Sequence, residues 1–218
     1  MSGLRERKKL KLANQLTEAA LALFIARGFE ATTINDIVAA VDVSARTFFR
    51  YFDSKEDVIV GFADRQGEEL CALVAARPRE EPPLTAIHRG LAALVARYDA
   101  QRDFALALLR LMNDTPAIRA RHLDKQDGWQ RGLAQEVARR LGIRSARDLR
   151  PRLIAGVALT TLDAAVAAWL ASNGRTSLAR LLDDAFGAVS GGLDRGSARR
   201  APARPRRRAP TAVGRRRR

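Results

Sequence analysis

The segment between residues 32 and 58 constrains the fold more than any other part of the chain, because it predicts two short helices joined by a tight turn. Thr33 is followed three residues later by Asp36, which is a capping-box pattern typical of a helix start. Apolar residues then recur at helical spacing, at Ile34, Ile37, Val38 and Val41. We therefore expect the first helix to begin at Thr33 and to bury one apolar face.

Asp42 is expected to form the turn between the two helices. Such a turn often needs a positive φ, which Asp tolerates better than most residues other than glycine. Ser44 is a suitable N-cap for the second helix, which we predict over Ser44–Phe52. Phe48 and Phe52 lie four positions apart and therefore share the buried face of that helix.

Arg46, Thr47 and Arg50 are left on the outward face of this second helix. Guanidinium and hydroxyl groups in this arrangement suit phosphates and base edges in the major groove of DNA. The alternative is a plain helical hairpin with solvated charges, but it does not account for both caps, the turn length and the outward spacing together. The pattern favours a recognition helix that binds DNA.

The run VSARTFFRYFDSKEDV, residues 43–58, resembles the recognition-helix signature of the tetracycline-repressor (TetR) family of bacterial transcription regulators. The resemblance implies an all-α fold, with an N-terminal three-helix DNA-binding domain that contains a helix-turn-helix and a larger C-terminal helical ligand-binding and dimerisation domain. It also implies a double-stranded DNA operator as partner. The residues expected to contact DNA are Thr33, Ser44, Ala45, Arg46, Thr47, Arg50, Tyr51 and Lys55.

The chain departs from the family pattern at four positions. Gly is common where Asp42 and Arg46 stand, Tyr is frequent at the position of Phe49, and His is common at that of Tyr51. Phe49 has no phenolic hydroxyl to offer a phosphate, although Tyr51 supplies one two residues later. Arg46 adds a guanidinium that can reach guanine in a bidentate manner.

Lys55 lies in the first turn of a helix that we expect to begin at Ser54. Its ammonium group and the backbone N–H groups of that turn are suited to a single phosphate. A lysine at such a position is also commonly just exposed to solvent. We favour the phosphate contact for Lys55.

The net charge of +15 is concentrated at the C-terminal end of the chain. Eleven arginines and no acidic residue lie between Arg195 and Arg218, and the remaining 28 basic residues against 24 acidic ones leave a charge of +4. We expect residues 194–218 to be a disordered Arg/Pro-rich tail. Such a tail either strengthens DNA binding non-specifically or serves only as a solubilising terminus.

The rest of the chain shows helical periodicity and no strand-like alternation. We expect a first helix that ends at Gly28, preceded by a basic arm formed by Arg5, Arg7, Lys8, Lys9 and Lys11. A connecting helix is expected from Ser54, in a capping box with Asp57, to about Ala76. Further helices are predicted at about 84–98, 103–113, 116–141, 149–172 and 177–193. Asp148 is the expected cap of the helix at 149–172. The predicted domains are therefore residues 1–53 and 54–193.

The helix that contains LIAGVALTTLDAAVAAWLAS, residues 153–172, is apolar on nearly every side. A membrane span is one interpretation, but Asp163 would then lie near the bilayer centre at a cost of about 2.5–3.5 kcal/mol. The other interpretation is that this helix packs against its own domain on one side and against a second copy of the chain on the other. The family resemblance implies a homodimer, without membrane contact, on a roughly palindromic operator.

Six residues are candidates for lining an apolar ligand cavity in the second domain: Phe104, Leu108, Met112, His122, Trp129 and Trp169. Leu133 and His88 are further candidates, and each of these side chains is more often ordinary core or surface. Residues 81–122 are loosely similar to family members that accept acyl-CoA-like ligands. We expect a small hydrophobic or acyl-CoA-like effector.

Several classes of protein are not supported by the sequence. We find no nucleophile elbow, phosphate-binding loop or metal-ligand spacing, so we expect neither an enzyme nor a cofactor nor a metal site. The single cysteine, Cys71, and the lack of a signal-peptide pattern fit a cytoplasmic protein. The competing hypotheses are a sequence-indifferent architectural DNA-binding protein, supported only by the Arg-rich tail, and a membrane-associated basic protein.

Overall fold

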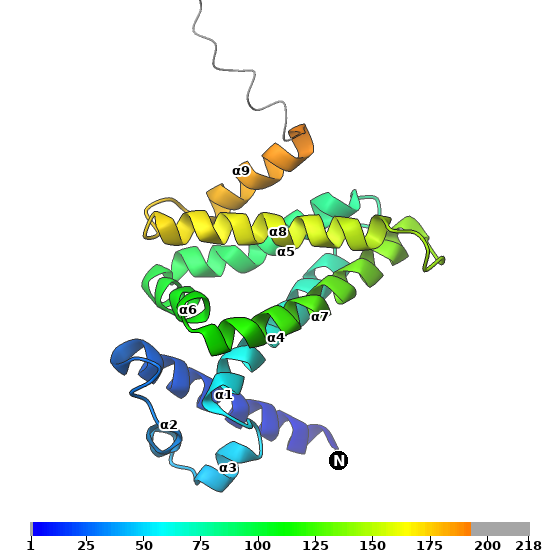
Figure 1. The fold of residues 1–218 in the computed structure, drawn as a ribbon. Helices are drawn as coiled ribbons and strands as arrows, with labels where there is room; N and C mark the ends of the chain where they lie inside the picture. The colour runs from blue at the N-terminus through cyan, green and yellow to red at the C-terminus, as the bar shows by residue number, and fades with distance from the viewer. Residues whose placement is uncertain (1, 193–218) are drawn as a thin grey trace, which may run out of the picture.

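A computed structural model describes residues 2–192, except for the side chains of residues 2–9, 124 and 125. Within this part of the chain the structure consists of helices joined by turns and loops, with no strand, as predicted (Figure 1). The helices are α1 Ser2–Arg27, α2 Ile34–Val41, α3 Ala45–Phe49, α4 Lys55–Ala75, α5 Pro83–Ala100, α6 Arg102–Asp114, α7 Pro116–Leu141, α8 Arg150–Ala171 and α9 Leu178–Gly191. The predicted Arg-rich tail, residues 194–218, lies outside the described residues.

The predicted caps of the helix-turn-helix are confirmed. The hydroxyl of Thr33 accepts a hydrogen bond from the Asp36 N–H at 3.2 Å, and the Asp36 carboxylate accepts one from the Thr33 N–H at 2.8 Å. The hydrogen bonds that the Asp36 carboxylate accepts from the hydroxyl and the N–H of Thr33, together with the nearby Arg27 guanidinium, lower the pKa of Asp36. The Ser44 hydroxyl accepts a hydrogen bond from the Thr47 N–H at 3.2 Å. Both helices of the motif therefore start where the sequence indicates.

Asp42 closes α2 in the left-handed conformation, with φ 55° and ψ 51°. Its N–H lies 3.4 Å from the carbonyl of Ala39, and the next N–H, of Val43, bonds to the carbonyl of Val38 at 3.0 Å. These bonds satisfy carbonyls at the helix end and turn the chain sharply. The positive φ expected for the turn residue is confirmed.

The second helix is shorter than predicted, because α3 ends at Phe49 instead of Phe52. The N–H of Arg50 bonds to the carbonyl of Thr47 at 3.3 Å, and the N–H of Tyr51 bonds to that of Phe48 at 2.9 Å. These bonds span three residues rather than four, so the last turn tightens. Arg50 and Tyr51 therefore lie in a turn that continues the helix.

The basic N-terminal segment is helical, and the prediction of an arm preceding the first helix is wrong. Helix α1 runs without interruption from Ser2 to Arg27, and Gly28 follows it with a φ of 87°. Its first half is rich in Leu, Arg and Lys, which are good helix formers, and has no proline or internal glycine after Gly3. The sequence interpretation gave too little weight to this propensity.

Two further helix starts differ in detail from the prediction. Ser54 caps α4 through the Asp57 N–H, but the Asp57 carboxylate accepts from the N–H of Asp53 and does not complete the predicted box with Ser54. Leu149 is the backbone N-cap of α8, while the carboxylate of the predicted cap, Asp148, accepts from the Arg150 N–H at 3.0 Å.

The described residues form two hydrophobic cores. The N-terminal core joins the buried faces of α1, α2 and α3 to the start of α4, and also includes Leu108 from α6 and Ile118 from α7. The C-terminal core is built from α4 to α9 and includes Trp169, whose side chain is fully buried. The N-terminal core therefore continues past residue 53, the predicted domain boundary.

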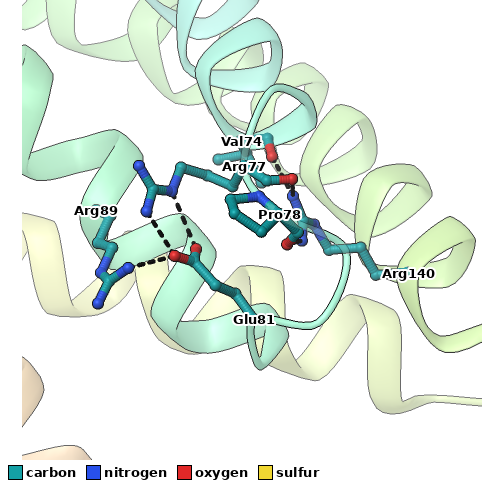
Figure 2. A network of polar contacts seen from close by, with 6 residues as sticks. All are labelled: Val74, Arg77, Pro78, Glu81, Arg89 and Arg140. Atoms are coloured by element: carbon teal, nitrogen blue, oxygen red, sulfur yellow. Dashed lines mark hydrogen bonds and ion pairs between the residues drawn. The ribbon is translucent and has the colours of Figure 1, made fainter.

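Arg140 on α7 holds the C-terminal end of α4 (Figure 2). Its guanidinium donates to the carbonyls of Val74, Arg77 and Pro78, at 3.0 Å for Arg77 and 2.7 Å for Pro78. Its Nε lies 3.4 Å from Oε1 of Glu136, one turn earlier on the same helix. This one side chain thus donates to three carbonyls in and directly after the last turn of α4, where the regular helical hydrogen bonds end.

On the other side of the same turn, Glu81 lies between Arg77 and Arg89 (Figure 2). The Arg77 guanidinium, which donates two hydrogen bonds, holds the pKa of the Glu81 carboxyl below its usual range, and Arg89 adds to this effect. The connection between α4 and α5 is thus fixed from both sides.

Helix α8 is long and apolar enough to cross a membrane by length and composition, and it is the one such helix found among the described residues. One face of it enters the C-terminal core through Ala155, Ala158, Leu159, Ala165 and Trp169. The opposite face leaves Leu149, Leu153 and Val157 exposed. A core helix of a soluble protein and a membrane span both satisfy that test, and the buried face shows that α8 is part of the helical core.

Candidate DNA-binding surface and ligand cavity

The short helix α3 and the turn that continues it present three large side chains to solvent: Arg46, Phe49 and Arg50. Phe48, on the opposite side, is fully buried in the N-terminal core and fixes the orientation of the helix. Ala45 and Thr47 are half-buried at the edges of the exposed face. The arrangement gives two cations and one aromatic ring on a convex surface, which suits insertion into a groove.

Arg50 and Tyr51 act as a pair. The Arg50 guanidinium lies 5.1 Å from the centre of the Tyr51 ring, and its Nη2 lies 3.3 Å from the phenolic oxygen. Stacking of this kind orients the guanidinium without neutralising it. The pair offers one cation and one hydroxyl at the end of α3.

The hydroxyls of the other predicted contact residues are already engaged. Thr33 donates from its Oγ1 to Asp36 at 2.6 Å, and the hydroxyls of Ser44 and Thr47 lie 3.0 Å apart. Both Thr33 and Ser44 are nevertheless exposed, at the N-terminal ends of α2 and α3. Their caps orient the first backbone N–H groups of these helices, a geometry that suits a phosphate.

Lys55 is held inside the domain and does not point freely to solvent. Its ammonium donates to the carbonyls of Phe29 at 2.8 Å and Thr32 at 3.4 Å, and it lies 4.2 Å from the centre of the Phe29 ring. Glu30 is an ion-pair partner at 3.9 Å. A phosphate contact by Lys55 would have to replace some of these bonds, so its present geometry gives it a role in fixing the turn before α2.

The start of α4 is joined directly to α7. The Arg121 guanidinium donates to the Ser54 hydroxyl at 3.2 Å and forms an ion pair with Asp57. Ser54 follows the recognition helix by five residues, and Arg121 precedes His122, a candidate cavity residue. The Arg121 side chain therefore links α7 to the start of α4, directly after the recognition helix.

A cavity of about 100 Å³ lies between helices α4, α5, α6, α7 and α8. Its lining is mostly apolar and aromatic, with Gln66, Tyr98, Gln126 and Asp163 as further polar residues beside His122. The other lining residues are Phe62, Ala63, Leu91, Leu94, Val95, Leu109, Met112, Trp129, Leu159, Leu162 and Val166. Among the side chains that the structure describes, no Lys or Arg lines it.

The structure brings three of the six predicted pocket residues together. Met112, His122 and Trp129 line the cavity. Leu108 is fully buried in the N-terminal core, and Trp169 is fully buried in the C-terminal core. Phe104 lies on the surface of α6 with 38% of its area exposed.

The two further candidates also lie away from the cavity. Leu133 is buried in the C-terminal core. His88 stacks on Phe186 and lies 2.8 Å from the Asp183 carboxylate.

The sequence interpretation missed the polar residues of the cavity other than His122, and most of its apolar lining. Gln126 and Asp163 come from α7 and α8, and the Gln126 amide donates to the Asp163 carboxylate at 3.1 Å. Partial desolvation raises the pKa of Asp163, although this hydrogen bond acts in the opposite direction. Asp163 was the one acid within an otherwise apolar helix, and that isolation was a signal for a site.

His122 and Trp129 each bring a buried ring nitrogen without a hydrogen-bond partner among the described residues to the lining of the cavity. In His122 this nitrogen is Nδ1, and the His122 ring contacts Trp129 edge to face at 5.9 Å. Burial lowers the pKa of His122. The ring is therefore neutral at physiological pH and can accept or donate one hydrogen bond to a ligand.

This lowered pKa predicts how stability depends on pH. Unfolded His122 takes up its proton below a pH of about 6.5, and the folded form resists protonation. The stability that His122 contributes is thus present above that pH and is lost as the pH falls through the folded pKa. Thermal unfolding measured from about pH 7.5 to about pH 5.5 should show a falling midpoint, and His122→Phe should flatten it.

His88→Gln is the matched control, because the chain contains two histidines. The fall of the midpoint that His122 causes should persist in this variant. An unchanged slope in His122→Phe would contradict the assignment.

The described residues contain no group of three or more His, Cys, Asp or Glu side chains that is arranged to hold a metal ion. Cys71 is half-buried on α4, where burial raises the pKa of its thiol. A thiol with a raised pKa has little thiolate character at neutral pH.

Solved structures of low sequence identity share the fold of this chain. FadR of Thermus thermophilus, a TetR-family transcriptional repressor solved in complex with lauroyl-CoA, is 22% identical, with a TM-score of 0.53 over 88% of this chain and 98% of that one. FadR of Bacillus halodurans is 18% identical, with a TM-score of 0.61 over 83% and 95% of the two chains.

Sequence relatives give the same answer at higher identity. The HTH-type transcriptional regulator TcmR of Streptomyces glaucescens is 37% identical over 161 residues, which cover 71% of each chain. The transcriptional regulator MftR of Mycobacterium tuberculosis is 28% identical over 189 residues, covering 87% of this chain and 94% of MftR.

Two family models match separate parts of the chain. Residues 81–194 match the MftR C-terminal domain, and residues 16–60, which contain the helix-turn-helix, match the bacterial regulatory proteins of the tetR family. The resemblance found in residues 43–58 is therefore confirmed. This chain belongs to the tetR family and is a DNA-binding transcriptional regulator.

Proposed function

We propose that this regulator is a ligand-responsive repressor that acts in the cytoplasm as a homodimer on a palindromic operator. The observation that carries the proposal is the exposed face of α3, with Arg46 and Arg50 projecting from a helix anchored by the buried Phe48. In this proposal residues 1–53 form the DNA-binding domain and residues 54–193 bind the effector and dimerise.

The unpartnered side of α8 supports the homodimer. Leu149, Leu153 and Val157 are exposed together with a series of alanines on the same helix. Burying this face against the same face of a second copy would remove apolar area from water by a two-fold arrangement. A two-fold protein presents two α3 helices and therefore requires two half-sites of opposite orientation.

Shared side chains support a response to ligand. Phe62 and Met112 line the cavity and also pack against the N-terminal core. A ligand that displaces them presses on the base of the DNA-binding unit, and a shift of α7 would also disturb the contact of Arg121 with Ser54 and Asp57. Ligand binding would thereby move α3 and release the operator.

The lining of the cavity supports a small hydrophobic effector. At about 100 Å³ the cavity is smaller than typical ligand pockets of about 300–1,000 Å³, so binding requires movement of adaptable side chains such as Met112. An acyl-CoA-like effector would place only its acyl chain here, because the described lining offers no cation to phosphates. Trp129, which lines the cavity, is a built-in fluorescent reporter of binding.

The decisive experiment is selection of duplexes from a random DNA library by the full-length protein, followed by footprinting and sedimentation of the complex. We expect one discrete palindromic sequence bound by two chains. Titration with lauroyl-CoA and with dodecanol then tests release. Binding without sequence choice would instead support the architectural DNA-binding protein.

The Arg-rich tail gives a separate prediction. Truncation after Leu193 removes eleven arginines and should reduce the slope of log affinity against log salt, because fewer counterions are released on binding. Sequence preference should stay as in the full-length chain, as measured by fluorescence anisotropy at several salt concentrations. Loss of sequence preference would contradict a non-specific role for the tail.

A further inference from the structure

Phe49 is the one exposed aromatic ring of the N-terminal domain whose position the fold does not explain. Its exposed fraction is 53%, whereas the other phenylalanines of this domain are buried in the N-terminal core, at Phe24, Phe29, Phe48 and Phe52. Exposing a ring of this size in the free protein forgoes apolar burial. Scattered exposed rings are common, so the position of Phe49 decides whether it has a function.

That position lies on the exposed side of α3, next to the two exposed arginines. Arg46 precedes Phe49 by three residues and therefore lies on the same side of the helix, and Arg50, in the turn that continues α3, follows Phe49 directly and is also exposed. The ring is also held in place, because it packs edge to face against the fully buried Phe48 with their centres 5.7 Å apart. Phe49 is thus a fixed apolar group beside two exposed cations.

The chemistry of this ring selects one partner within a DNA groove. Phe49 has no polar side-chain atom, so it cannot bond to a phosphate or to the nitrogen and oxygen atoms of a base edge. The apolar group that distinguishes one base from the others in the major groove is the C5-methyl of thymine.

We propose that Phe49 is a specificity-determining residue that selects thymine in each half-site through contact of its ring with the C5-methyl group. The inference rests on the proposed binding of α3 in the major groove. Arg46 and Arg50 bind phosphates or guanine beside it, and Phe49 contributes sequence preference without charge.

The test removes single methyl groups from the DNA. Each thymine of the selected duplex is replaced in turn by deoxyuridine, which lacks only that methyl, and affinity for the full-length protein is measured by fluorescence anisotropy. We expect one position per half-site at which the loss is about fourfold, as for burial of one methyl-sized group. The same replacement should leave the affinity of Phe49→Ala unchanged. At all other thymines the parent protein and Phe49→Ala should lose affinity equally.

Two variants separate recognition from folding. Phe49→Leu keeps an apolar group and should remain sensitive to deoxyuridine. Both Phe49→Leu and Phe49→Ala lose the ring contact with Phe48, so a folding defect from that loss would appear in both variants. Phe104→Ala removes the 38% exposed ring on α6 and should leave the affinity for every duplex unchanged.

Two results would overturn the inference. One is a selected operator in which no thymine is sensitive to loss of its methyl. The other is a sensitive thymine that remains sensitive in Phe49→Ala. A selection that yields no discrete sequence would instead overturn the proposed function itself, so the two failures are distinguishable.

Discussion

Replacing Arg46 or Arg50 by Ala is expected to weaken operator binding by about 1–3 kcal/mol per half-site, roughly 5- to 150-fold. Both guanidinium groups project from α3 into solvent, and neither contributes to the N-terminal core. The substitutions should therefore weaken the complex with DNA without lowering the stability of the folded protein. Fluorescence anisotropy with the selected duplex measures the affinity, and circular dichroism checks the fold.

Arg131→Ala is the control for loss of one positive charge, because Arg131 is exposed on α7 and pairs with Asp127 one turn earlier. This variant should bind the operator almost as tightly as the parent. If Arg46→Ala and Arg50→Ala bind with unchanged affinity and sequence preference, α3 is not the recognition helix.

Replacing Arg140 by Met is expected to lower the free energy of unfolding by about 3–5 kcal/mol, the cost of removing one partner of a buried ion pair. Only 3% of its side chain is exposed, and 7% of that of Glu136. The variant would leave Glu136 without its buried cation and three carbonyls at the end of α4 without this donor. Urea denaturation followed by circular dichroism measures the change.

Arg139→Ala is the matched control for this substitution. Arg139 is also an ion-pair partner of Glu136, but 71% of its side chain is exposed. A pair of this kind contributes less than about 1 kcal/mol, so the control should unfold close to the parent. An equal decrease in the free energy of unfolding of both variants would show that the burial of Arg140 is not the reason for its contribution to stability.

The recognition motif could be predicted from the sequence because its determinants are local. Thr33, Asp42 and Ser44 define caps and a turn through bonds to residues within four positions of them. A sequence read at that range contains all of the required information. The early end of α3 was missed because helical periodicity does not distinguish a final turn with tighter hydrogen bonds.

The cavity was only partly predictable, because it depends on contacts between residues far apart in the chain. Phe104 and Trp169 are large apolar residues that recur at helical spacing, and so are Met112 and Trp129, so the sequence does not distinguish them. Packing of five helices decides which of them faces an empty volume, and it turns Phe104 outward and Trp169 into the core. Lys55 shows the same limit, since its carbonyl partners lie 23 and 26 residues away.

The double position of Phe62 and Met112, between the cavity and the N-terminal core, has an evolutionary consequence. A substitution at either residue alters the shape available to an effector and the support beneath the DNA-binding unit at once. Changes of effector range through these two side chains are therefore expected to change basal repression as well. Variants that respond to new compounds without altered repression should instead carry their substitutions at Leu91, Leu159 and Val166, which line the cavity and pack in the C-terminal core.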